Sequence, residues 1–269
     1  MKTILISEWK TMTRQRSYYT FFILWVLVFS LLFLLEKTNS GISGFTNITG
    51  TILNIILYLL PLFMLITGSF SIANEMENGQ WQLLSTYPVS LLAYLLGKCG
   101  GLFTAQTVIF TLSFGCSMGI GLIAGNAMTL GWLLKIYLFS ILLIYTFIIL
   151  GLLIGTWVKT RWQAFTISVA MWFFLIMIWP TALITFLGLV PYPVIEPIMK
   201  MAMMLNPAEF LRIFFIVKWD SGSVFGQSYD SIVTLFHSGA GWLILSAYLA
   251  IYLVAFISLA LLCLQRRRQ

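Results

Sequence analysis

Six long apolar stretches alternate with short segments that hold most of the polar residues. They cover residues 18–35, 51–73, 99–124, 132–157, 164–189 and 241–264. A helix needs about 20 mainly apolar residues to cross the hydrocarbon core of a bilayer, and each stretch is close to that length or longer. The pattern therefore predicts an all-α polytopic membrane protein with six transmembrane helices in one domain, residues 18–264.

Composition supports a protein whose solvent is mostly lipid. Of the 269 residues, 60% are hydrophobic and 9% are charged, and the mean hydropathy is +0.98. A soluble domain carries about 25% charged residues. These values exclude an ordinary water-soluble enzyme. The first stretch is also too long for a signal peptide, and Glu36 and Lys37 follow it where a cleavage site would need small residues.

The placement of basic residues predicts the orientation. Ten of them flank one side of the predicted spans: Lys2, Lys10, Arg14, Arg16, Lys98, Lys159, Arg161, Arg266, Arg267 and Arg268. Because short cytoplasmic segments hold the excess of Lys and Arg, we expect both termini in the cytoplasm. The net charge of +7 is scattered between apolar runs. We therefore expect no nucleic-acid partner.

Residues 1–17 and 265–269 flank the predicted membrane domain. In the first segment Leu5, Trp9 and Met12 recur at helical spacing among charged residues. This pattern predicts an amphipathic elbow helix that lies against membrane lipid at the inner interface. The second segment predicts a basic cytoplasmic tail.

Residues 74–98 form the predicted cytoplasmic loop between the second and third spans. The loop opens with Asn74-Glu75-Met76-Glu77, which is typical of a helix start, since Asn caps a helix and carboxylates favour its N-terminus. We expect a short interfacial helix that ends near Thr86, before Pro88.

Residues 190–240 form the predicted extracytoplasmic loop. Its apolar, helix-like part covers residues 195–217, which is too apolar for a free loop. We expect it to lie on the outer leaflet or against a partner. Met199 and Met203 share a helical face and are weak candidates for soft-metal ligands, but methionine at an apolar surface needs no metal to explain it, so we expect no metal site.

The sequence lacks the residues of several function classes. Apart from Lys135, near an end, the six predicted spans contain no ionisable acid or base, which argues against a proton-coupled carrier or ion pump. The single histidine, His237, offers neither a metal cluster nor a catalytic triad by itself. No phosphate-binding glycine loop with Lys and Ser or Thr occurs, so the chain cannot hydrolyse ATP alone.

Prolines and glycines mark candidate bends and contacts in the spans. Pro61 and Pro180 should kink their helices, and these two helices are candidates to line a path. Four glycine pairs at a spacing of four should allow close helix packing: Gly97 and Gly101, Gly115 and Gly119, Gly121 and Gly125, and Gly151 and Gly155.

The cytoplasmic loop resembles that of ABC-2 type ABC transporter permeases. The motif is Glu75-x-Glu77-x-Gly79-x-x-x-Leu83-Leu84-x-x-x-Pro88-x-Ser90, closing with Gly97-Lys98. The chain is most similar to the Nos-type branch, whose transporter serves copper processing and nitrous-oxide reductase maturation. That likeness rests on Leu59-Leu60-Pro61-Leu62, Leu84-Ser85-Thr86-Tyr87-Pro88 and Leu205-Asn206-Pro207-Ala208-Glu209-x-x-Arg212.

The resemblance implies a homodimer in the cell membrane of a prokaryote. Two cytoplasmic ATPase subunits would hold ATP and Mg²⁺, with no cofactor in this chain, and a β-helical accessory protein would bind outside. The implied ATPase-coupling residues are Glu75, Glu77, Gly79, Trp81, Leu84 and Pro88, with the helix of residues 74–86 acting as a cytoplasmic coupling helix. The implied elbow residues are Glu8, Arg14 and Arg16, and the implied outer docking residues are Asn206, Pro207, Glu209 and Arg212.

Two other functions stay open at this point. The chain could be an ABC-2 permease that exports a drug, peptide, lipid or glycan, or a membrane scaffold or intramembrane enzyme without transport activity. The shortage of convergent catalytic groups argues against an enzyme. The cargo does not follow from the residues.

Overall fold

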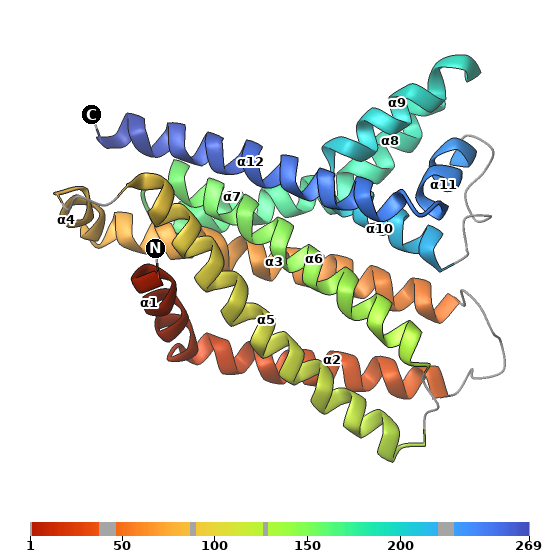
Figure 1. The fold of residues 1–269 in the computed structure, drawn as a ribbon, viewed down its shortest axis with the longest axis horizontal. Helices are drawn as coiled ribbons and strands as arrows, with labels where there is room; N and C mark the ends of the chain where they lie inside the picture. The colour runs from red at the N-terminus through yellow and green to blue at the C-terminus, as the bar shows by residue number, and fades with distance from the viewer. Residues whose placement is uncertain (1, 38–46, 87–89, 126–128, 220–228, 269) are drawn as a thin grey trace.

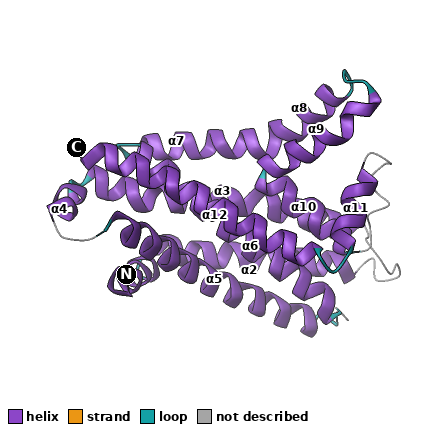
Figure 2. Cartoon of the chain, turned by 45° about the horizontal axis from the view of Figure 1, so that its top comes forward, coloured by secondary structure: helices purple, strands orange, loops and turns teal. Residues whose placement is uncertain are grey.

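The computed structural model describes residues 2–37, 47–86, 90–125, 129–219 and 229–268, and every regular element in these ranges is a helix (Figure 2). The elements are α1 (Lys2–Thr13), α2 (Arg16–Lys37), α3 (Asn47–Glu77), α4 (Gln80–Thr86), α5 (Leu91–Ile123), α6 (Leu130–Trp157), α7 (Arg161–Trp172), the π-helix η1 (Phe173–Ile178), α8 (Trp179–Leu187), α9 (Tyr192–Leu205), α10 (Pro207–Lys218), α11 (Asp230–His237) and α12 (Gly241–Arg268).

Among the described residues, five helices are long and apolar enough to cross a membrane. They are Thr49–Glu77, Leu91–Ile123, Leu130–Trp157, Arg161–Leu187 and Gly241–Arg267. A sixth span is obtained only if α1 and α2, which meet at 68°, count together as one bent element. The all-α polytopic fold is therefore confirmed. Five of the six predicted spans are confirmed as single helices that are long and apolar enough to cross a membrane.

The long helices run side by side and place both termini at the same end (Figure 1). Helix α4 lies at this end too, and we call it the terminal end. Helices α9 and α11 lie at the opposite end, which we call the distal end. Helix α6 is central. In an apolar 18-residue stretch of α6, 78% is buried, whereas only 17% of such a stretch is buried in α12 and in the span formed by α7, η1 and α8.

Glycines explain how tightly α3 and α6 pack. A Cβ atom on Gly151 would lie 2.8 Å from the backbone oxygen of Leu65, and one on Gly68 would lie 2.8 Å from that of Ile148. Real Cβ atoms do not approach so closely, so both positions require glycine. Gly155 approaches α3 in the same way, which confirms close packing for the pair Gly151 and Gly155.

Other glycines of the predicted pairs face open space. A Cβ atom on Gly115, Gly119 or Gly125 would meet nothing within 4 Å, so no described helix of this chain packs there. Gly101, by contrast, lies against α1, as described below.

Aromatic side chains join α2 to α5. Trp25 and Phe29 of α2 are fully buried, and the ring of Phe110 of α5 lies 5.5 Å from each of them. Such edge-to-face pairs add to the burial of apolar area. The first predicted span thus packs against the third through these aromatic side chains.

The predicted start of the short helix in the loop 74–98 is wrong. Asn74–Glu77 does not start a new helix; it is the last turn of α3, and the Oδ1 atom of Asn74 is buried with no hydrogen-bond partner in the described chain. The break comes at Gly79, whose φ of +70° ends the helix, and the short helix is α4 alone. Helix α5 begins at Leu91, so Lys98 is part of a span.

Among its described residues, the predicted outer segment 190–240 contains three helices instead of one helix-like stretch. Asn206 ends α9 and caps α10, and Pro207 occupies the first turn of α10, where its missing N–H costs nothing. The part at 220–228 lies outside the described residues.

The described residues of the predicted basic tail 265–269 continue helix α12, which runs to Arg268. Arg267 donates a 2.9 Å hydrogen bond from Nη1 to the backbone oxygen of Val158, and Nη2 donates to that of Trp157. These carbonyls lie at the C-terminal end of α6, where a cation is favourable. The tail therefore ties α12 to α6.

Candidate coupling region

A buried ion cluster joins α1, α3 and α5 at the terminal end. Lys98 is 1% exposed, and its Nζ atom lies 2.7 Å from Oε1 of Glu8 and 2.8 Å from Oε1 of Glu75. The same atom donates to the backbone oxygen of Ser71 at 2.9 Å and to its Oγ at 3.1 Å. Every proton of the ammonium group therefore has an acceptor.

Tyr94 completes this cluster, since its hydroxyl donates a hydrogen bond to Oε2 of Glu75. A buried charge is tolerated when it is paired and fully hydrogen-bonded, and removal of one partner is strongly destabilising. The cluster thus fixes three helices in one register: Glu8 on α1, Glu75 on α3 and Lys98 on α5.

Glycine lets α1 come close enough for this contact. A Cβ atom on Gly101 of α5 would lie 2.7 Å from Cβ of Glu8 and 2.9 Å from the backbone oxygen of Leu5. A larger residue would push α1 away and lengthen the bond from Lys98 to Glu8. The predicted elbow helix therefore packs directly on α5.

Helix α4 is attached to this cluster through an aromatic pair. Trp81 is 8% exposed, and its ring centroid lies 5.5 Å from that of Tyr94. The open space around Gly79 shows that this glycine serves the positive φ of the turn within the chain. Leu83 is 68% exposed, so it is the large apolar side chain that α4 presents outward among the described side chains of this helix.

Glu77 connects the end of α3 to the start of α7. Its Oε2 atom accepts a 2.7 Å hydrogen bond from the backbone N–H of Arg161 and lies 3.8 Å from Nε of the same residue. An acidic group at a helix N-terminus satisfies an orphan N–H and favours the helix dipole. The coupling region therefore comprises the ends of α1, α3, α5 and α7 together with α4.

The other predicted residues of this region have simpler surroundings or cannot be placed. Arg14 and Arg16 are exposed at the junction of α1 and α2. Pro88 and the side chain of Leu84 lie outside the described residues. Their roles in coupling stay predictions, as does that of Trp81, which is covered by Tyr94.

The predicted outer docking residues form one group at the start of α10. Asn206 is fully buried: its Nδ2 atom donates a 2.7 Å hydrogen bond to the backbone oxygen of Leu175 in η1, and its Oδ1 atom accepts one from the N–H of Ala208. Glu209 is 7% exposed and accepts bonds of 2.6 and 3.1 Å from Arg212. Docking to a partner stays a prediction.

Comparison with known proteins identifies the family. The family model described as ABC-2 family transporter protein matches residues 2–266. The chain belongs to the ABC-2 transporter family. It is a multi-pass membrane permease, and the family's permease subunits are not themselves catalytic.

Two curated relatives of this ABC-2 permease carry the same name. The "Probable ABC transporter permease protein NosY" of Stutzerimonas stutzeri is 28% identical over 255 residues, which cover 88% of this chain and 89% of the relative. The protein of that name from Pseudomonas aeruginosa is 26% identical over 218 residues, covering 75% and 79% respectively.

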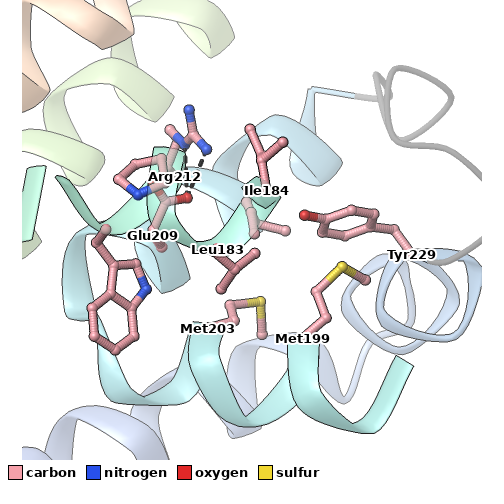
Figure 3. A pocket seen from close by; sticks show the side chains of 10 residues that line it. Leu183, Ile184, Met199, Met203, Glu209, Arg212 and Tyr229 are labelled. Atoms are coloured by element: carbon pink, nitrogen blue, oxygen red, sulfur yellow. Dashed lines mark hydrogen bonds and ion pairs between the residues drawn. The ribbon is translucent and has the colours of Figure 1, made fainter. Parts of the chain in front are cut away.

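The candidate methionines of the permease lie in a distal pocket with a volume of about 70 Å³. Met199 and Met203 of α9 are 2% and 4% exposed, and Figure 3 shows them on one side of the pocket, opposite Glu209 and Arg212. No group of three or more His, Cys, Asp or Glu that could hold a metal occurs among the described residues.

The family motif contains Leu83 and Lys98, but neither received a role from the sequence, and Tyr94 was missed. Two spacings of four could have revealed the cluster: Tyr94 and Lys98 share a face of α5, and Ser71 and Glu75 share a face of α3. Lys98 was assigned to a loop because charge counting treats every lysine near a span as a flank.

Proposed function

We propose that this permease is the membrane subunit of an ATP-driven transporter, and that separate ATPase subunits bind its terminal end. These subunits would supply ATP and Mg²⁺ and bind on the cytoplasmic side of a prokaryotic cell membrane. A second copy of the chain would complete the membrane part. Membership of the ABC-2 family supports the ATPase partner and the dimer.

The observation that carries the proposal is the attachment of α4 to the ion cluster. A force on α4 would pass through Trp81 to Tyr94, and from there to Glu75 and Lys98, which bind α3, α5 and α1 together. Glu77 would pass the same force to α7. Because packed helices are not continuously deformable, motion at the terminal end would move whole spans.

The exposed side chain of Leu83 gives the test. We expect Leu83→Asp to abolish co-purification of the ATPase subunits, since an aspartate would place a charge in an apolar contact. Leu205→Asp is the matched control, because Leu205 is also 68% exposed but lies at the end of α9, in the distal half. Equal recovery of the ATPase subunits with both variants would refute this contact.

We further propose that the transporter serves copper-site maturation of nitrous-oxide reductase. The two relatives named NosY support this branch. In this account a β-helical accessory protein binds outside, near the group formed by Asn206, Pro207, Glu209 and Arg212. Export of a drug, peptide, lipid or glycan is the alternative within the family.

Deletion of the gene distinguishes these two roles. The Nos-type role predicts that nitrous oxide reduction is lost and returns when the wild-type chain is restored. Unchanged reduction of nitrous oxide in the deletion strain would favour the export role.

A further inference from the structure

The π-helix η1 leaves one backbone oxygen without a donor from its own helix. The N–H of Trp179 bonds to the oxygen of Phe174, five residues back, and so does not serve Leu175, which would be its partner in an α-helix. In the π register the donor for Leu175 would be the N–H at position 180, and Pro180 has none. The oxygen of Leu175 therefore needs a donor from elsewhere.

Asn206 supplies this donor from the corner between α9 and α10. Its Nδ2 atom donates a 2.7 Å hydrogen bond to the oxygen of Leu175, and both residues are buried. Its Oδ1 atom accepts a bond from the N–H of Ala208, which fixes the amide with its donor toward Leu175. Serine and aspartate cap a helix as well as asparagine does, but neither carries an N–H donor beside the capping oxygen. The contact with η1 therefore requires the amide.

The bond from Asn206 to Leu175 closes the base of a helical hairpin. Leu175 comes shortly before α8, and Asn206 comes directly after α9. Figure 1 shows these two helices projecting together from the bundle. The structure describes all of α8, and none of its residues is buried, while Leu189, between the two helices, is 83% exposed. Because segments with few buried contacts move most easily, the hairpin depends on its base for its position.

A second hydrogen bond at the base of the hairpin does not involve η1. The hydroxyl of Tyr248 in α12 donates a 3.1 Å bond to the backbone oxygen of Met204, and the ring of Tyr248 stacks on Phe210 with 3.9 Å between the centroids. This bond holds the end of α9 to α12. A substitution at Tyr248 can therefore weaken the base without changing the donor for Leu175.

We propose that Asn206 takes the place of the N–H that Pro180 lacks, and that its bond to Leu175 makes η1 the pivot of a rigid arm formed by α8 and α9. Because the two ends of the arm are joined at one point, α8 and α9 move together. The π-helix, where the backbone hydrogen bonds change register, takes up the change in angle. Asn206 is thus a positioning residue that acts through the backbone of Leu175. The pivot depends neither on the cargo nor on the ATPase contact at Leu83.

A double-mutant cycle tests the exchange between Asn206 and Pro180, measured by thermal unfolding of the purified permease in detergent. Asn206→Ser keeps a capping oxygen but is too short to reach Leu175. We expect it to lower the unfolding temperature by about 4–8 °C. In the Pro180→Ala background, where position 180 regains its N–H, the same change should cost less than about half as much. Tyr248→Phe is the control and should cost the same in both backgrounds. Equal losses for Asn206→Ser in the two backgrounds would overturn the proposal.

A distance measurement covers the case in which Pro180→Ala does not fold. In a cysteine-free background, spin labels would replace Leu189, at the tip of the arm, and Leu130, at the start of α6, which is 68% exposed. We expect Asn206→Ser to widen the distance distribution about twofold, because the arm loses its pivot. Tyr248→Phe should leave the distribution close to that of the wild type. An unchanged distribution for Asn206→Ser, or equal widening by the two variants, would overturn the proposal.

Discussion

Oε1 of Glu8 accepts a 2.7 Å hydrogen bond from Nζ of Lys98, although 90 residues separate them in the chain. This bond connects the N-terminal helix to the third apolar span, and the second bond of Lys98, to Glu75, adds the second span. A cation that is 1% exposed would be prohibitively costly without these partners. Lys98 therefore connects α1, α3 and α5 at the terminal end.

Lys98→Met should destabilise the permease by about 3–5 kcal/mol, because the partly buried carboxylates of Glu8 and Glu75 would keep their charges without a counter-ion. Thermal unfolding in detergent measures this change. The triple variant that also contains Glu8→Gln and Glu75→Gln should recover most of the loss. Lys159→Met, at an exposed position, is the control and should change stability by less than about 0.5 kcal/mol. If Lys98→Met alone is as stable as the wild type, the ion cluster does not hold the three helices together.

Gly151→Val should separate α3 from α6, because the new Cβ atom would overlap the backbone oxygen of Leu65, which cannot move independently of its helix. We expect a loss of at least about 1–3 kcal/mol and low yield of folded protein. Gly115→Val is the matched control in the same kind of helix, at a position where a Cβ atom meets nothing within 4 Å. Similar yields and unfolding temperatures for the two variants would contradict the observed crossing.

Asn206→Ala should lower stability by about 2–3 kcal/mol, since it removes the cap of α10 and also the bond to the backbone oxygen of Leu175 in the π-helix. Ser90→Ala removes a cap from α5 at an exposed site and should cost about 0.5–1 kcal/mol. Unfolding in detergent compares the two. If both cost the same, the bond to the π-helix contributes nothing.

Much of the fold follows from the sequence because lipid imposes a simple length rule. The apolar stretches at 51–73, 132–157 and 241–264 predict α3, α6 and α12 well. The rule fails at helix ends, since it measures only the apolar part. Helix α3 continues through Asn74 and Glu75 to Glu77 because nothing before Gly79 breaks it.

The coupling region was predicted in part. Glu75, Glu77 and Glu8 came from a family motif, and the structure places Glu8 and Glu75 on one lysine and Glu77 on the start of α7. The spacing of Tyr94 and Lys98 indicates a shared face of α5, but the pairing of Lys98 with Glu8 over 90 residues could not be predicted, because it depends on how three helices pack. The surroundings of Trp81 could not be predicted either, because an aromatic residue on a short helix can face a partner protein or its own chain. The contact with Tyr94 shows that Trp81 faces its own chain.

The distal end was the least predictable part. Hydropathy indicates an apolar segment after residue 190 but does not separate α9 from α10, because the break depends on the side chain of Asn206. The π-helix η1 has no simple sequence signal, although Pro180 follows two residues after its end. Pro61, which we also expected to kink its helix, is buried within α3, whereas Pro180 lines the distal pocket.

The distance between α4 and α9 tests the central claim, that a partner ATPase moves this permease through its terminal end. Spin labels would replace the exposed residues Asn78, beside α4, and Met201, on α9, in a cysteine-free background. In the complex with its ATPase subunits, ATP should shift the distance distribution, and the permease alone should not respond. An unchanged distribution in a complex that hydrolyses ATP, or an equal shift in the permease alone, would contradict the account.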